Sequence, residues 1–260
     1  MSTEQTSTEK EQKLLDHILG LPKEKLDSIR GRPEEVLKVI DDYSNNVESF
    51  MNVGPLKGKV IVDKIREVKP KVMIELGGYV GYSAILFANE LLEDPAAKYY
   101  SFEINEGFAK IARQIIQLAG LEHKVTIVVG RAANSLAEIA HTWEEQKHSY
   151  VSVGFVFIDH WKNLYVPDLR VLESLNLIAP GTVIAADNIY FPGAPDYVKY
   201  VQGSPEERRE HNYSVPNING QEYLGRWNIL YESKTIAVPE PNKNRTDAVE
   251  ITKCIEYLNG

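Results

Sequence analysis

The sequence predicts an α/β fold built on a doubly wound, mostly parallel sheet. Two observations indicate this fold: short apolar runs alternate with longer amphipathic segments, and several of the runs end abruptly in glycine or in acidic residues. The runs are too short for helices, and their nearly continuous apolar character is typical of strands buried on both faces. Strands separated by helices of this length form right-handed βαβ units.

Each element can be placed by its pattern. Five strands are expected at Val72–Leu76, Tyr99–Phe102, Val125–Val129, Val153–Ile158 and Thr182–Ala186, with helices at Ser83–Leu92, Phe108–Leu118, Ala132–Gln146 and Leu169–Leu177 between them. Extra N-terminal helices precede the first strand: one carries Leu14, Leu15, Ile18 and Leu19, one begins at Pro33, and one spans Lys57–Glu67. A short helix is expected at Asp196–Gln202, followed by an antiparallel hairpin of Trp227–Tyr231 and Thr235–Val238 at one edge of the sheet.

The chain shows no internal repeat or linker, so a single domain is expected. Residues 1–10 are polar and are expected to form a disordered tail. Residues 11–240 are expected to form the domain. Residues 241–260 are expected to form a C-terminal extension with a helix at Asp247–Leu258.

Composition excludes several classes of protein. Hydrophobic residues make up 43% and charged residues 25% of the chain, as in an ordinary globular protein. The formal net charge of −8 argues against a general nucleic-acid or anionic-membrane binder. The single cysteine, Cys254, rules out an internal disulfide and favours a reducing compartment. With no apolar run long enough to span a membrane, a cytoplasmic location is expected.

Oxygen-bearing side chains end two of the predicted strands in succession. Asp159 follows Val153–Ile158, and Asp187 and Asn188 follow Thr182–Ala186. Ligands of open α/β sheets bind beyond the carboxyl ends of the strands, and few hard oxygen donors suit Mg²⁺. The alternative is that these residues cap helices.

His160, Trp161 and Lys162 follow Asp159 directly. A divalent ion and the neighbouring indole would disfavour the charged form of Lys162, so this lysine is a candidate general base; the alternative is a solvated loop lysine. His160 lacks a second histidine nearby and suits a hydrogen-bonding role better than metal ligation.

A glycine-rich turn, Gly77–Gly81, follows the first strand. Tyr79 stands where the dinucleotide fingerprint has its second glycine, which leaves little room for a pyrophosphate. A cofactor without phosphates therefore fits better, and Glu103, at the end of the second strand, is placed to accept both hydroxyls of a ribose. The alternative is a tight turn beside a solvated acid.

These residues stand in motifs that resemble the catechol O-methyltransferase family. The motifs are Met51–Gly54, Ile74–Ser83, Ala119–Ile127, Ile158–Lys162, Ala186–Asn188 and Pro192–Asp196, and the resemblance runs from about Glu11 to about Val238. It implies a class I, Rossmann-like enzyme that moves a methyl group from S-adenosyl-L-methionine to one hydroxyl of a small-molecule catechol.

The resemblance also implies roles for single residues. Asp159, Asp187 and Asn188 would bind Mg²⁺, and Lys162 would be the general base. The cofactor would contact Val53, Glu75, Gly77, Tyr79, Ser83, Glu103, Ile104, Asp159, His160 and Trp161. The acceptor would contact Met51, Trp161, Lys162, Asn188, Pro192 and Glu222.

The chain departs from the family in three places. Ala132 and Ala133 replace a Ser-Gln pair near the adenine, which removes two side-chain hydrogen bonds. Ser49 replaces an aromatic wall of the acceptor pocket, with Phe50 beside it. The segment Gly203–Tyr223 is longer and more polar than in the family. A nicotinamide oxidoreductase and a catalytically silent S-adenosylmethionine-binding protein are the alternative functions.

Overall fold

The computed structural model describes residues 8–145, 152–241 and 244–259. The helices are α1 Glu9–Leu19, α2 Lys23–Ile29, α3 Pro33–Asn46, α4 Gly54–Val68, α5 Tyr82–Ala88, α6 Glu106–Leu118, α7 Ala132–Glu145, α8 Tyr165–Ser174, α9 Pro195–Gln202 and α10 Pro205–Ser214. The strands are β1 Val72–Leu76, β2 Lys98–Glu103, β3 Val125–Val129, β4 Phe155–Ile158, β5 Val183–Ala186, β6 Ile229–Glu240 and β7 Arg245–Tyr257.

The strands form one sheet in the order β3-β2-β1-β4-β5-β7-β6. The first five are parallel, and β7 runs antiparallel to both of its neighbours. This confirms the predicted Rossmann-like, doubly wound α/β fold with an antiparallel hairpin at one edge. The chain order reverses between β1 and β4, which is where such sheets bind ligands.

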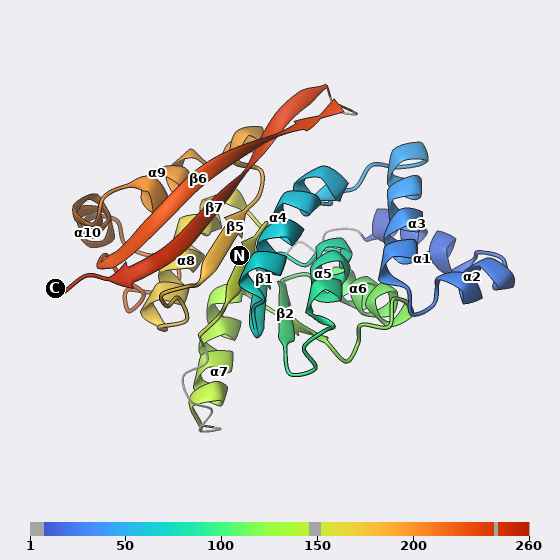
Figure 1. The fold of residues 1–260 in the computed structure, drawn as a ribbon, viewed down its shortest axis with the longest axis horizontal. Coiled ribbons are helices and arrows are strands. Elements are labelled where there is room, and N and C mark those ends of the chain that lie inside the picture. The colour runs from blue at the N-terminus through green and yellow to red at the C-terminus, as the bar shows by residue number, and fades with distance from the viewer. Residues whose placement is uncertain (1–7, 146–151, 242–243, 260) are drawn as a thin grey trace.

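Helices cover both faces of the sheet and bury a hydrophobic cluster on each. One cluster joins Phe155 and Phe157 of β4 to helices α1, α3, α4, α5 and α6, and the other joins Val156 and Ile158 to α7, α8 and α9. Alternate side chains of a strand point to opposite faces, so this one short strand contributes to both clusters. The N-terminal helices α1–α3 lie at one end of the molecule, away from the β6–β7 hairpin (Figure 1).

The prediction for the C-terminal region was wrong. The two segments predicted to pair with each other, Trp227–Tyr231 and Thr235–Val238, fall along the single strand β6 and the residues just before it. The partner of β6 is β7, where a helix was predicted at Asp247–Leu258. β7 pairs with β5 along one edge and with β6 along the other. Asp247–Glu250 are buried in succession, so both faces of the strand are covered at these residues. This segment therefore lacks the polar–apolar alternation that reveals half-exposed strands.

Two smaller differences concern α1 and α10. Glu9 and Lys10, predicted to belong to a disordered tail, begin α1, and Thr8 is its N-cap residue. Residues 1–7 of that predicted tail lie outside the described residues. Helix α10 was not predicted, although Ser204 and Glu207 form a capping box at its start. In the described part of the chain, no helix has the length and apolar character needed to cross a membrane.

Candidate active site

The two predicted acidic strand ends lie side by side. Ile158 and Ala186 are partners in the parallel pairing of β4 and β5, and the backbone N–H of Asp187 donates to the carbonyl of Ile158. Burial, and after it the nearby charge of Asp187, raises the pKa of Asp159 to about 8. Burial also raises the pKa of Asp187. The structure thus brings the partly exposed carboxylate of Asp159 and the buried carboxylate of Asp187 close enough to oppose each other's ionisation.

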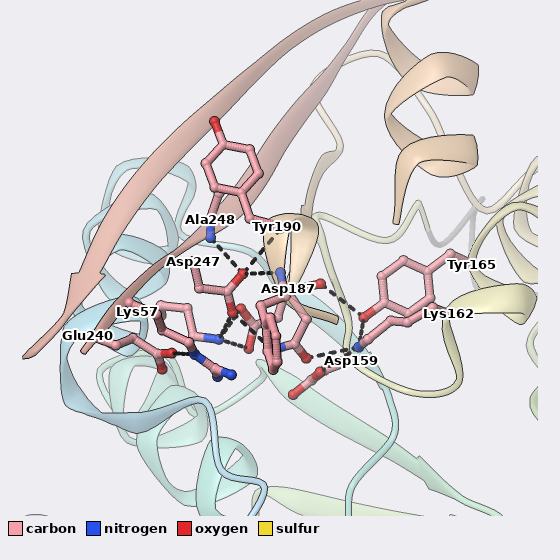
Figure 2. A network of polar contacts seen from close by, with 12 residues as sticks. Lys57, Asp159, Lys162, Tyr165, Asp187, Tyr190, Glu240, Asp247 and Ala248 are labelled. Atoms are coloured by element: carbon pink, nitrogen blue, oxygen red, sulfur yellow. Dashed lines mark hydrogen bonds and ion pairs between the residues drawn. The ribbon is translucent and has the colours of Figure 1, made fainter. Parts of the chain in front are cut away.

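Lys162 lies beside these strand ends. Its Nζ donates to Asn188 Oδ1 at 2.9 Å, to Asp159 Oδ1 at 3.2 Å and to the hydroxyl of Tyr165. That hydroxyl in turn donates to the backbone carbonyl of Asp187 at 3.1 Å. The predicted general base therefore contacts two of the predicted metal ligands, Asp159 and Asn188. Figure 2 shows Lys162 beside Asp159 and Tyr165.

A second lysine, which was not predicted, lies on the other side of Asp187. Lys57 of α4 is 2% exposed, and its Nζ lies 2.7 and 2.8 Å from the two carboxylate oxygens of Asp187. It also donates to Asp247 Oδ2 on β7 at 2.8 Å. Burial opposes the charge of Lys57, but the two carboxylates outweigh it and raise the pKa of this lysine. Sequence patterns did not indicate this pair, because Lys57 was assigned only to a helix and Asp247 to a C-terminal extension.

The cofactor side of the predicted site is formed by the glycine-rich turn and the end of β2. Both carboxylate oxygens of Glu103 accept backbone N–H groups, Oε2 from Tyr79 at 2.7 Å and Oε1 from Asn105 at 2.8 Å. Burial raises the pKa of Glu103. A Cβ on Gly77 would lie 2.7 Å from the carbonyl oxygen of Asp159, so the turn packs directly against the backbone that follows β4.

Glu75 is the last but one residue of β1, shortly before this turn in the chain, and is fully buried. Its Oε2 accepts from the Ser101 hydroxyl at 2.6 Å, and among the described residues its Oε1 has no hydrogen-bond partner. Burial raises its pKa to about 7, an effect that the hydrogen bond from Ser101 reduces. The described residues thus leave one oxygen of this buried carboxyl group without a hydrogen bond.

Tyr79 connects the turn to α1. Its backbone has a positive φ of 45°, and its hydroxyl donates to the buried Glu11 of α1 at 2.5 Å. Its ring contacts Phe50 and, edge-on, Phe108, with centroids 6.2 and 5.0 Å away. Phe50 is therefore part of the core while Ser49 is exposed, so the buried Phe50 does not replace an aromatic wall at position 49.

Large apolar side chains are exposed among the predicted ligand contacts. Met51 is 72%, Trp161 73% and Ile104 55% exposed, and Phe191 beside Pro192 is 54% exposed. Single exposed apolar side chains are ordinary on protein surfaces, so exposure alone does not identify these residues as ligand contacts. Val53 and Ser83, by contrast, are buried.

The ring of His160 is oriented by Asp168 and Tyr165. One ring nitrogen, Nε2, lies 2.7 Å from Asp168 Oδ2, and the ring stacks on Tyr165 with centroids 5.3 Å apart. Asp168 also accepts from Asn219 at 2.7 Å. The other nitrogen, Nδ1, is buried without a hydrogen-bond partner among the described residues. His160 thus has a fixed orientation and one nitrogen available.

Glu222 does not join the network at the ends of β4 and β5. It is exposed, in the segment between α10 and β6, and a Cβ on Gly220 would lie 2.5 Å from its carboxylate. The glutamate that Figure 2 labels is instead Glu240, at the end of β6. It accepts from Arg245 Nε at 2.6 Å, and the Arg245 guanidinium lies 4.0 Å from the centre of the Phe191 ring.

Comparison with known proteins gives the family. A model of the O-methyltransferase family matches residues 32–212. The chain is 38% identical over 202 residues to catechol O-methyltransferase of Bos taurus, covering 78% of this chain and 70% of that protein. It is 39% identical over 195 residues to the Mus musculus catechol O-methyltransferase, covering 75% and 69%. The chain belongs to the catechol O-methyltransferase family.

This family member is accordingly an S-adenosylmethionine-dependent O-methyltransferase. Among solved structures, an O-methyltransferase from Bacillus cereus in complex with SAH has a TM-score of 0.57 at 22% identity, covering 93% of this chain and 96% of that one. That likeness supports the fold described above.

The donor set of this O-methyltransferase can be tested against Mg²⁺. In the described ranges, no group of three or more His, Cys, Asp and Glu side chains could hold a metal ion. The candidate donors are instead two carboxylates and an amide, from Asp159, Asp187 and Asn188. Lysine ammonium groups contact all three side chains, and Lys57 Nζ lies 2.7 Å from Asp187 Oδ1. The three side chains offer oxygen donors only, with no thiol or imidazole, and lysine cations already contact these oxygens. Such a donor set fits a hard divalent ion.

Proposed function

We propose that this O-methyltransferase is a Mg²⁺-dependent enzyme that transfers the methyl group of S-adenosylmethionine to one hydroxyl of a catechol. The observation that carries the proposal is the meeting of Asp159, Asn188 and Lys162 at the ends of β4 and β5. The similarity to catechol O-methyltransferases of Bos taurus and Mus musculus supports a catechol as the acceptor.

The reaction forms a bond between the acceptor oxygen and the methyl carbon and breaks the bond between that carbon and sulfur. The methyl group is already activated because it is bonded to a positively charged sulfur. The acceptor hydroxyl is a weak nucleophile until it loses its proton. Asp159, Asp187 and Asn188 would hold Mg²⁺, which, when bound, lowers the pKa of a hydroxyl beside it. Lys162 in its neutral form accepts the proton at Nζ.

The other residues bind and orient. Glu103 accepts the ribose hydroxyls of the cofactor, and Glu75, shortly before the glycine-rich turn, offers its free oxygen. Met51, Trp161 and Pro192 flank the flat ring of the acceptor. Holding the oxygen, carbon and sulfur in line makes a bimolecular step effectively unimolecular, which supplies much of the acceleration.

The test is a methyl-transfer assay on a panel of simple and carboxylated catechols, with Mg²⁺ or with excess chelator. Transfer to one hydroxyl that requires Mg²⁺ is expected. Transfer that persists in chelator would remove the metal from the mechanism. Cofactor binding without transfer to any catechol would indicate a silent binding protein or a different acceptor class.

Lys162→Ala should lower kcat by about 10²–10⁴, the usual contribution of a general base. Lys162→Arg keeps the positive charge but cannot accept a proton, so it should lose activity as well. Lys59→Ala, at an exposed lysine of α4, is the control. Wild-type turnover in Lys162→Arg would show that the charge alone suffices.

A further inference from the structure

The buried ion pair of Lys57 and Asp247 contacts two of the proposed metal ligands, Asp187 and Asn188. Lys57 comes from α4 and Asp247 from β7, and the two residues are 190 positions apart in the chain. Both are almost completely buried, at 2% and 0% exposure. A buried ion pair is weak evidence for stability, since removing two charges from water costs as much as their attraction returns. Its geometry therefore needs another explanation.

Asp247 accepts hydrogen bonds from five donors. Its Oδ1 accepts the backbone N–H groups of Tyr190, Phe191 and Ala248 at 3.2, 3.0 and 2.8 Å. Its Oδ2 accepts from Lys57 Nζ at 2.8 Å and from Asn188 Nδ2 at 3.1 Å. One carboxylate thus fixes the residues that follow β5, from Asn188 to Phe191.

The bond to Asn188 determines which way its amide points. An ionised carboxylate only accepts hydrogen bonds, so the NH₂ group of Asn188 must face Asp247. Its Oδ1 is then directed away, and it accepts from Lys162 at 2.9 Å. Lys57 meanwhile contacts both carboxylate oxygens of Asp187. Two of the three proposed ligands are therefore oriented by this ion pair.

We propose that Asp247, together with Lys57, is a positioning residue that sets the orientation of Asn188 and Asp187 for Mg²⁺. The inference rests on the proposed function, since it assumes that these side chains bind the ion. Residues behind metal ligands typically change metal affinity by 10–100-fold when they are replaced.

The first test is Asp247→Asn. Three backbone donors require the amide oxygen of the new side chain, so its NH₂ group faces Lys57 Nζ and Asn188 Nδ2. Donors then face donors, and the Asn188 amide should turn away from its present orientation. We expect the affinity for Mn²⁺, used as a spectroscopic probe and measured by electron paramagnetic resonance, to fall 10–100-fold. SAH affinity, measured by calorimetry without metal, should change less than twofold.

Glu250→Gln is the matched control. Glu250 is buried on the same strand, and it accepts from Gln202, Ser233 and Thr235 rather than from the residues after β5. It should lose thermal stability yet keep its Mn²⁺ affinity. An equal loss of affinity in both variants would mean that any damage to β7 weakens the site, and it would overturn the proposal.

A double variant, Lys57→Met with Asp247→Asn, separates orientation from charge. It removes one ammonium and one carboxylate, so the net charge of the site stays as in the wild type. It also leaves no buried ammonium group without its carboxylate, so it can be measured even if the single variant folds poorly. Mn²⁺ affinity at least 10-fold below wild type is expected. Wild-type affinity in the double variant would show that only charge matters. Absence of Mn²⁺ binding in the wild-type protein would instead contradict the proposed function.

Discussion

At the scale of single residues, the most unusual group is Glu75. A carboxyl group that is completely buried in a parallel strand keeps its proton far more readily than one in water. Its pKa of about 7, against an ordinary value of 4.5, follows mainly from burial. The residue was predicted as a cofactor contact, and its protonation also affects the stability of the protein.

The stability of the cofactor-free protein should fall as pH rises from about 4.5 to 7 at this site. In that window the unfolded chain releases the proton of Glu75 while the folded protein retains it, so the folded state loses relative stability. The total is about 3 kcal/mol, and above pH 7 the effect is constant. Glu75→Gln cannot ionise, so its free energy of unfolding relative to wild type should increase across the window, as measured by urea unfolding at each pH.

The exposed Glu138→Gln on α7 is the control for replacing a carboxyl group by an amide. The same difference from wild type at pH 5 and pH 8 for Glu75→Gln would show that Glu75 is not the titrating group.

At the scale of elements, the turn between β1 and α5 is fixed by its approach to the chain after β4. Gly77 has a φ of 100°, and its N–H donates to the carbonyl of Phe102 at 2.9 Å. The absence of a side chain lets the turn lie against the carbonyl of Asp159. The glycine-rich turn and Asp159, a proposed metal ligand, therefore lie in direct contact.

Gly77→Ala should reduce both stability and cofactor affinity. The left-handed backbone costs an alanine about 1–2 kcal/mol, and displacement of the Asp159 backbone by the new methyl group adds roughly 1–3 kcal/mol. Gly181→Ala is the control, since Gly181 has a φ of 98° and no atom within 4 Å of the added Cβ. Urea unfolding and calorimetric titration with SAH measure the two effects. Equal losses in the two variants would exclude a role for the close approach.

At the scale of the whole molecule, the N-terminal helices share the core of the sheet. Leu14, Leu15 and Ile18 of α1 are buried in the same cluster as Met73 of β1 and Phe157 of β4. Glu11 of the same helix accepts from Tyr79 in the glycine-rich turn. Helix α1 should therefore unfold together with the sheet.

Leu14→Ala should destabilise the protein by about 2–5 kcal/mol because it opens a cavity in this core. Leu19→Ala, on the same helix at a side chain that is 45% exposed, should change stability by no more than about 0.5 kcal/mol. Guanidinium unfolding followed by circular dichroism should show a single transition for Leu14→Ala, shifted to lower denaturant. A separate early transition would mean that α1 is not part of the same cooperative unit.

Several features of this protein follow from local sequence. A strand such as Phe155–Ile158 and the polar residues after it are adjacent in the chain, so the apolar run and the chemistry at its end are visible together. Parallel neighbours then meet at one edge of the sheet, which is why Asp159, Lys162 and Asn188 could be placed together before the structure was known. The glycine-rich turn and Glu103 were predictable for the same reason.

Other features depend on partners that are distant in sequence, and only the tertiary structure decides them. Asp247 shows no local sign of a strand, because both faces of β7 are covered at Asp247–Glu250. In the sequence, Lys57 looks like an ordinary helical lysine. Only the folded chain brings it to Asp187, which is 130 positions away. A buried charge is stable only where an opposite charge meets it, and where that meeting occurs is set by the packing of the whole chain.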